Sequence, residues 1–186
     1  MKEERLPSFD PAMLLLDIIK LSYLYSGNRV NLRVPSRLSE QEGVVYGVES
    51  LYQRQGDDNV QVIDQSEYDT FLSTIAGSYL ESVCAAVIDY IDYDYKLSVG
   101  RVRVVNMPAK YGLTYHTDPE SQYRFHIPVV TNENVLFIVD DVVQRMPLRG
   151  SLYRLDVQKK HTVVNASRED RIHIIFDGYD PTTSVN

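Results

Sequence analysis

Cysteines and long apolar stretches are nearly absent from this chain of 186 residues. The single cysteine, Cys84, rules out an intrachain disulfide and a zinc site made of cysteines alone. It falls within an apolar stripe, so we expect a buried thiol in the core. The longest apolar stretches, residues 14–19 and 83–88, are far too short to span a bilayer, so no membrane-spanning helix is expected.

Positive charge is also in short supply. The chain has 19 lysines and arginines against 26 aspartates and glutamates, which gives a formal net charge of −7 at pH 7. We therefore expect no nucleic-acid partner, because phosphate backbones are bound through broad basic surfaces. A single arginine can still bind a small anion. The first residues are charged and lead into no apolar run, unlike a signal peptide, so the expected compartment is the cytoplasm.

The first half of the chain carries the periodicity of helices. Asp10 suits a helix N-cap and Pro11 the first turn, and the apolar residues after them predict a helix that ends near Gly27. A helix-start signature at Ser66 precedes apolar residues at three- and four-residue spacing, which predict a long helix to about residue 92. Residues 28–65 show no sustained periodicity, and no regular element is predicted there.

The second half carries the periodicity of strands. After Leu97, short strand-like segments follow near residues 112–117, 122–130, 134–140, 151–156, 160–165 and 170–177. Strands this short and evenly spaced are typical of a β sandwich or barrel. We therefore predict a mainly β protein with supporting helices in one folded unit: a helical region over 1–97 that packs on a β barrel over 98–178, and a tail over 179–186.

The second half also holds a candidate metal-binding set. His116 and Asp118 are two residues apart, so in a strand their side chains point to one face. With His161 they would give the two histidines and one carboxylate of the facial triad found in non-haem Fe(II) oxygenases, which leaves three coordination positions open. Each motif alone is weak. The alternatives are a surface histidine before an Asp-Pro turn for His116, and a solvated strand end for His161.

Arginine and histidine alternate with apolar residues in two predicted strands. Arg124 and His126 share one strand face, and Arg171 and His173 share one face of another strand. A barrel with these cations inside needs an anion to neutralise them, because an unpaired buried charge is costly. The alternative is that these faces meet solvent while the apolar faces fill the core. The occurrence of the pattern in two strands favours the interior site.

In this order, the motifs resemble the Fe(II)/2-oxoglutarate dioxygenases of the aspartyl/asparaginyl β-hydroxylase superfamily, nearest to the branch with bacterial proline hydroxylases. The resemblance covers about residues 98–178, and the helical first half offers no matching motif. The segments that carry it are residues 115–118 (YHTD), 123–128 (YRFHIP), 150–156 (GSLYRLD), 161–165 (HTVVN) and 171–173 (RIH).

The resemblance implies a double-stranded β-helix, a jelly roll of the cupin type, that holds Fe(II) through His116, Asp118 and His161. Arg171 would bind the far carboxylate of 2-oxoglutarate, because the guanidinium fork matches a carboxylate and stays charged. Some protein-modifying members carry glycine in place of the metal-binding carboxylate. Here Asp118 completes the triad, which weakens any transfer of their substrate.

Further roles also follow from the resemblance. Arg124 and His126 would lie beside the co-substrate and substrate carboxylates. Asn165 would cap the turn into the last strand, and His173 would either contact the site or pack as a polar residue. Substrate contacts are expected from the loop after Asp118 and from residues 28–65.

The implied reaction is hydroxylation of an amino acid, free or within a peptide, with 2-oxoglutarate and O2 converted to succinate and CO2. A small molecule or a peptide is thus the expected partner, and the sequence gives no oligomeric state. Two other classes stay open. One is a cupin-like small-molecule binding protein without turnover, which has no need of His116, Asp118, His161 and Arg171 together. The other is a cupin-like isomerase or hydrolase with another metal, which does not need Arg171.

Overall fold

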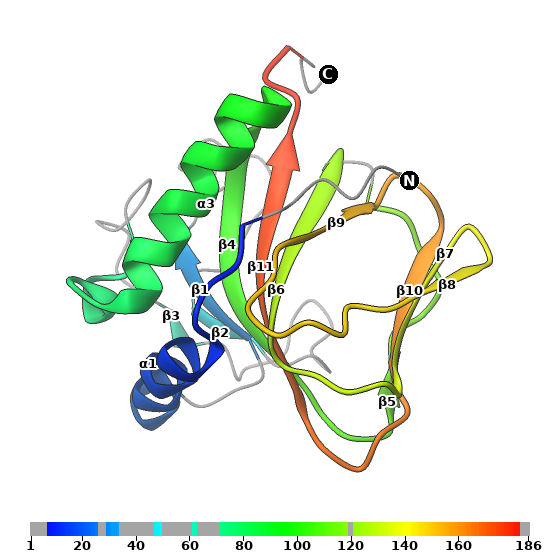
Figure 1. The fold of residues 1–186 in the computed structure, drawn as a ribbon, viewed down its shortest axis with the longest axis horizontal. Helices are drawn as coiled ribbons and strands as arrows, with labels where there is room; N and C mark the ends of the chain where they lie inside the picture. Colours follow the sequence, from blue (N-terminus) through cyan, green and yellow to red (C-terminus); the bar gives the residue numbers. More distant parts are fainter. Residues whose placement is uncertain are drawn as a thin grey trace.

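The computed structural model describes residues 7–25, 29–33, 47–49, 61–62, 71–118 and 121–182 (Figure 1). In these residues the chain folds into two antiparallel sheets, with helices on the outer face of the larger sheet. The elements are α1 Pro11–Leu24, β1 Arg29–Arg33, β2 Gly47–Glu49, β3 Gln61–Val62, η2 Ser73–Ile75, α3 Tyr79–Tyr95, β4 Ser98–Met107, β5 Tyr111–Gly112, β6 Tyr123–Val130, β7 Val135–Val139, β8 Val142–Gln144, β9 Tyr153–Asp156, β10 His161–Asn165 and β11 Arg171–Tyr179.

The sheets face one another as in a jelly roll. The larger has the strand order β3-β2-β1-β4-β11-β6-β9 and the smaller has the order β5-β10-β7-β8. Every neighbouring pair is antiparallel. The predicted fold class, a mainly β barrel of the cupin type preceded by helices, is confirmed.

Helix α1 begins where the sequence predicted. The Asp10 carboxylate accepts hydrogen bonds from the backbone N–H groups of Ala12 and Met13, which have no partner within the helix. The helix ends at Leu24, and the predicted stop at Gly27 lies outside the described residues.

The predicted start of the second helix at Ser66 lies outside the described residues, and between residue 71 and α3 the predicted helix is interrupted. Residues 71–78 form a short 3₁₀ turn and a bend, and α3 starts at Tyr79. Gly77 has a left-handed φ of 72°, which interrupts the helix. The hydroxyl of Ser78 accepts from the backbone N–H of Glu81, whose carboxylate accepts from the N–H of Gly77. This capping pair sets the start of α3.

Strand boundaries depart from the prediction in several places, and β8 lies where no segment was predicted. The segment predicted near 112–117 is a strand only at β5, followed by one isolated bridge at His116. Strand β11 runs to Tyr179, a buried residue that was expected in the tail. In the stretch 28–65, which had no predicted element, β1 pairs with β4, and β2 and β3 follow outward. Pairing along an existing sheet edge can form strands that local periodicity does not reveal.

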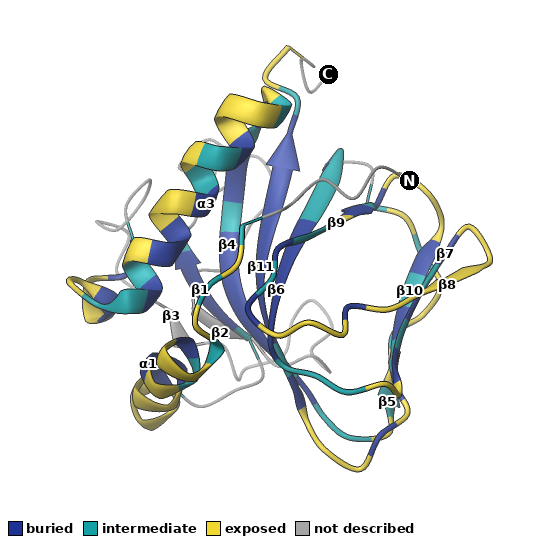
Figure 2. Cartoon of the chain, viewed as in Figure 1, coloured by how far each residue is buried: buried dark blue, intermediate teal, exposed yellow. Residues whose placement is uncertain are grey.

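Two apolar clusters hold the layers together. The larger lies between the helices and the large sheet and includes Cys84, which is fully buried as predicted, with Ile174 and Phe176 of β11. The smaller lies between the sheets and includes Met107 and Phe137. In Figure 2 the helices are buried on the side toward the sheet and exposed on the outer side. Neither α1 nor α3, the helices of the described chain, is long and apolar enough to cross a bilayer.

Candidate metal centre and pocket

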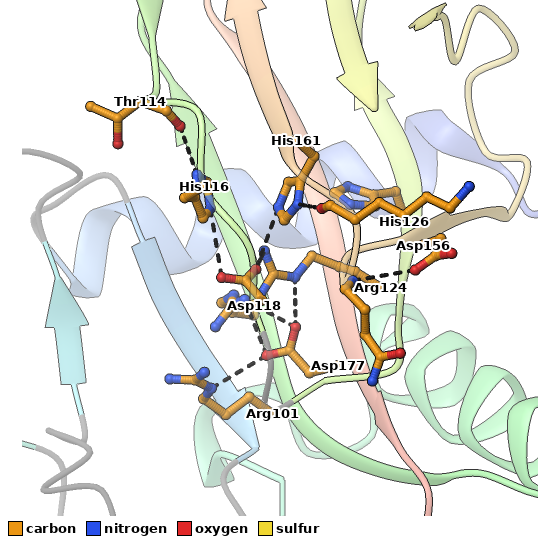
Figure 3. A network of polar contacts seen from close by, with 12 residues as sticks. Arg101, Thr114, His116, Asp118, Arg124, His126, Asp156, His161 and Asp177 are labelled. Atoms are coloured by element: carbon orange, nitrogen blue, oxygen red, sulfur yellow. Dashed lines mark hydrogen bonds and ion pairs between the residues drawn. The ribbon is translucent and has the colours of Figure 1, made fainter. Parts of the chain in front are cut away.

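The predicted triad is assembled where an isolated backbone bridge joins His116, between β5 and β6, to His161, the first residue of β10. His116 and His161 exchange two backbone hydrogen bonds, of 3.0 and 2.7 Å, and their ring centroids are 4.5 Å apart. The backbone N–H of Asp118 donates to the carbonyl of Val157 at 2.9 Å, which fixes the carboxylate beside the rings. One ligand atom from each of the three side chains lies within 4.8 Å of the others (Figure 3).

The two imidazoles are oriented with the same nitrogen toward this centre. Nδ1 of His116 lies 2.6 Å from the carbonyl of Thr114, and Nδ1 of His161 lies 2.9 Å from the carbonyl of Lys159. A carbonyl only accepts, so each Nδ1 carries the hydrogen and each Nε2 keeps its lone pair. The Nε2 atoms lie 3.6 and 3.5 Å from the carboxylate oxygens of Asp118.

One atom of the triad, Nε2 of His161, is buried without a hydrogen bond to any described residue, and Oδ2 of Asp118 lies in ion-pair contact with Arg124. Buried polar atoms almost always have a partner, so an imidazole nitrogen without one, which converges with a second imidazole nitrogen and a carboxylate, suits a metal ion. Burial alone would raise the pKa of Asp118, but His161, Arg124 and His116 lower it to about 2. The group is therefore an ionised carboxylate at neutral pH, and the three residues fit a divalent cation.

A buried ion-pair network holds the carboxylate of Asp118 in place. Nη1 of Arg124 lies 2.6 Å from Oδ2 of Asp118, and its Nε donates to Oδ1 of Asp177 at 2.7 Å. Asp177, on β11, is fully buried and also pairs with Arg103 at 3.1 Å and Arg101 at 3.3 Å. Figure 3 shows Arg124 between the two carboxylates. The predicted place of Arg124 beside the co-substrate and substrate carboxylates stays a prediction, and in the structure its guanidinium lies between the carboxylates of Asp118 and Asp177.

Sequence reasoning missed Asp177 and Arg103. Burial alone would raise the pKa of Asp177, but the surrounding arginines hold it well below its usual range. The signal for Asp177 was a lone acidic residue that ends an apolar strand segment, where an unpaired charge would be costly.

Arg171 occupies another part of the interior. Its side chain is 2% exposed, and its guanidinium lies 5.2 Å from the ring centre of Phe137. No carboxylate in the described part of the chain pairs with Arg171, and its Nε is buried without a hydrogen bond. Burial lowers its pKa to about 9, so it is still a cation at neutral pH. A buried guanidinium without a carboxylate suits an anionic ligand.

His126 and His173 form a pair beside Arg171. Nη2 of Arg171 lies 3.4 Å from Nδ1 of His126, which lies 3.4 Å from Nδ1 of His173. A guanidinium only donates, so His126 accepts at Nδ1 and carries its hydrogen on Nε2, which is buried and has no partner. Burial, with the charge of Arg171, holds the pKa of both histidines well below the usual value. His126 is thus a neutral donor.

These groups share one pocket of about 600 Å³, its open mouth included. Five of the six predicted site residues line it, and Asp118 reaches it through its contacts with three of them. The lining residues are Arg29, Arg103, Val105, Met107, Leu113, His116, Arg124, His126, Phe137, Leu155, Val157, His161, Thr162, Val163, Arg171 and Ile175.

The remaining expectations have mixed outcomes. Arg29 brings the stretch 28–65 to the pocket, where substrate contacts were expected. Residues 119–120, directly after Asp118, lie outside the described residues. The side-chain amide of Asn165 donates to the carbonyls of Met107, Pro108 and Glu169, so it ties the turn before β11 as predicted.

Comparison with known proteins gives one family and a set of distant structures. The family model described as aspartyl/asparaginyl beta-hydroxylase matches residues 78–181. No curated protein matches the chain. Similar solved structures include the plu4264 protein from Photorhabdus luminescens (15% identity, TM-score 0.36, 44% of this chain and 62% of that one). A cupin domain from Bordetella pertussis Tohama I (18%, 0.35, 44% and 90%) and the Schizosaccharomyces pombe Cnp3 cupin domain (12%, 0.37, 45% and 64%) are also similar.

Proposed function

Because the chain belongs to the aspartyl/asparaginyl β-hydroxylase family, we propose that it is an Fe(II)- and 2-oxoglutarate-dependent dioxygenase that hydroxylates an amino acid, free or within a peptide. The observation that carries this proposal is the convergence of two imidazole nitrogens and one carboxylate within 4.8 Å. One of these ligand atoms, Nε2 of His161, is buried without a hydrogen bond to any described residue, and Arg124 contacts the carboxylate of Asp118. Such a set leaves open positions on the metal for a co-substrate and O2.

His116, Asp118 and His161 would hold the Fe(II). When bound, the iron would supply, together with 2-oxoglutarate and O2, the oxidising power that converts a C–H group to an alcohol. Succinate and CO2 are released in the process. The protein's part is to fix the ligand atoms. The carbonyls of Thr114 and Lys159 do so by holding the two Nδ1–H groups.

Arg171 and His126 would bind the far carboxylate of 2-oxoglutarate. Arg171 offers a buried guanidinium without a carboxylate in the described residues, and His126 offers an Nε2–H without a partner. The ring of Phe137 packs against both side chains and limits their movement. Because these donors lie in a buried part of the pocket, little water competes for the carboxylate.

Arg124 would act on the metal centre through Asp118. It contacts one carboxylate oxygen of Asp118 and is itself held by the buried Asp177. This arrangement keeps Asp118 ionised and limits its rotation, so a ligand oxygen stays directed at the centre.

The test is succinate formation from 2-oxoglutarate, followed by proton NMR after addition of Fe(II) and O2. We expect slow conversion without an added substrate, and faster conversion when an amino acid or peptide that is hydroxylated is present. Arg171→Gln should abolish the conversion, whereas Arg149→Gln, at an exposed site, should leave it unchanged. If Fe(II) binds but 2-oxoglutarate is not consumed under any condition, the dioxygenase assignment is wrong and a binding protein or metal isomerase is favoured.

A further inference from the structure

The pocket lining includes an arginine, Arg103, that has no part in the chemistry described above. Arg103, on β4, is 5% exposed yet lines the pocket. One terminal nitrogen, Nη2, lies 3.1 Å from the carboxylate of Asp177, its one ionic partner in the described chain. Its Nε and Nη1 make no hydrogen bond with the described residues and are not fully buried, so both are accessible to a ligand that enters the pocket.

The charges around Arg103 favour an additional anion. Asp177 is shared among three guanidiniums, those of Arg101, Arg103 and Arg124. The second nearby carboxylate, Asp118, contacts Arg124 and would be committed to the metal. Burial lowers the pKa of Arg103 to about 9, against the opposing effect of Asp177. A further carboxylate at this point would offset the cost of holding a buried guanidinium that shares its only counterion.

The strand register places Arg103 away from Arg171 along the length of the sheet. Arg103 pairs with Ile175 of β11, and Arg171 lies four residues earlier on the same strand, paired with Met107. Alternate residues share a face, so both arginines face the pocket, about 13 Å apart along the strand at roughly 3.3 Å per residue. Two carboxylates from two molecules can therefore bind separately. The Arg103 end adjoins the triad, because Arg103 and Arg124 share Asp177.

We propose that Arg103 forms a second anion subsite, which binds the α-carboxylate of a free amino acid that serves as the substrate. This assignment rests on the proposed function and narrows its substrate from an amino acid, free or within a peptide, to a free one. An internal residue of a peptide presents neutral amides to this position and would leave Arg103 without the added carboxylate.

The test uses full-length protein with Zn(II) in place of Fe(II) and saturating 2-oxoglutarate, so that no turnover occurs. Each free L-amino acid is first added to this protein, and binding is detected as a rise in the thermal midpoint. Each amino acid that binds is then compared with its carboxamide by calorimetry. We expect at least one amino acid to bind, and its carboxamide to bind about tenfold or more weakly, because a charge-assisted hydrogen bond is lost. An N-acetylated, C-amidated form of the same residue should not bind better than the carboxamide.

Arg103→Gln should weaken binding of the acid by about tenfold or more and leave binding of the carboxamide unchanged. Arg103→Lys, which keeps the charge, should lie between wild type and Arg103→Gln and serves if the glutamine variant does not fold. Equal binding of acid and carboxamide by wild type would overturn the proposal, as would undiminished binding of the acid by Arg103→Gln. Binding of amidated peptides only, with no free amino acid bound, would also overturn it.

The two proposals fail separately. The stabilisation of wild type by Zn(II) and then by 2-oxoglutarate is measured first, and its absence contradicts the dioxygenase assignment. If both ligands stabilise the protein and no amino acid binds, the Arg103 subsite is wrong while the dioxygenase assignment stands.

Discussion

The buried carboxylate of Asp177 gives the most quantitative expectation. Asp177→Asn keeps the shape of the side chain and removes its charge, which leaves three guanidiniums around a neutral amide. The Asp177 side chain is 0% exposed, and those of Arg103 and Arg124 are 6% and 17% exposed, so solvent screens little of the change. Breaking a buried ion pair by removing one partner costs about 3–5 kcal/mol. We expect a loss of that size in the free energy of unfolding.

Urea denaturation followed by circular dichroism measures this loss at pH 7. Asp89→Asn is the matched control, because Asp89 is exposed on α3, and it should change the free energy by less than about 0.5 kcal/mol. A loss below about 1 kcal/mol for Asp177→Asn would refute the reasoning, since it would mean that the arginines do not depend on Asp177.

The same variant has a pH signature. Burial alone would raise the pKa of Asp177, but the arginines depress it well below the usual value near 4. A depressed folded-state pKa contributes stability that is present above the unfolded pKa and lost as the pH falls through the folded one. The gap in stability between wild type and Asp177→Asn should therefore be constant near neutral pH and narrow below about pH 4. A gap that widens with acid would contradict the depressed pKa.

Three further expectations concern single positions. Ser78→Ala removes the cap of α3 and should lower the free energy of unfolding by about 1 kcal/mol in urea denaturation; no change would mean that the cap is dispensable. Gly150→Ala should lower the free energy of unfolding further, by at least about 2 kcal/mol, because Gly150 has φ 79° and an added Cβ would collide with the carbonyl oxygen of Phe9. An unchanged free energy of unfolding in the same assay would contradict that contact. Asn165→Ala removes the amide that donates to three carbonyls, of which that of Glu169 keeps the Ser167 hydroxyl as a donor, and should lower the thermal midpoint by several degrees, of the order expected for about 1–3 kcal/mol; an unchanged midpoint would show that water replaces the amide.

Local signals account for what could be predicted from the sequence. The strands of the second half alternate with period 2, and β6, β7, β9, β10 and β11 lie close to their predicted segments. The spacing of His116 and Asp118 indicated a shared centre, and the structure brings them together with His161. The cationic faces of Arg124 and Arg171 point to the interior, because Ile174 and Phe176 on the opposite face fill the core beneath the helices.

The rest depends on contacts between residues far apart in the sequence. Asp177 meets Arg101, Arg103 and Arg124 only after β4, β6 and β11 have paired, so no motif marks the network. The ion pairs of Arg124 with Asp118 and Asp177 could not be predicted for the same reason. Strand β1 forms by pairing with the edge of β4, and its polar–apolar alternation runs over only five residues, too few to mark a strand on their own.

The central claim is that the His116, Asp118 and His161 set holds iron that chelates 2-oxoglutarate. The direct measurement is visible absorption of the apoprotein under anaerobic conditions, on addition of Fe(II) and then 2-oxoglutarate. We expect the weak charge-transfer band of a chelated 2-oxo acid in wild type, and its loss or weakening in Asp118→Ala and Arg171→Gln. Iron bound by wild type without such a band, or a band unaffected in both variants, would contradict the account.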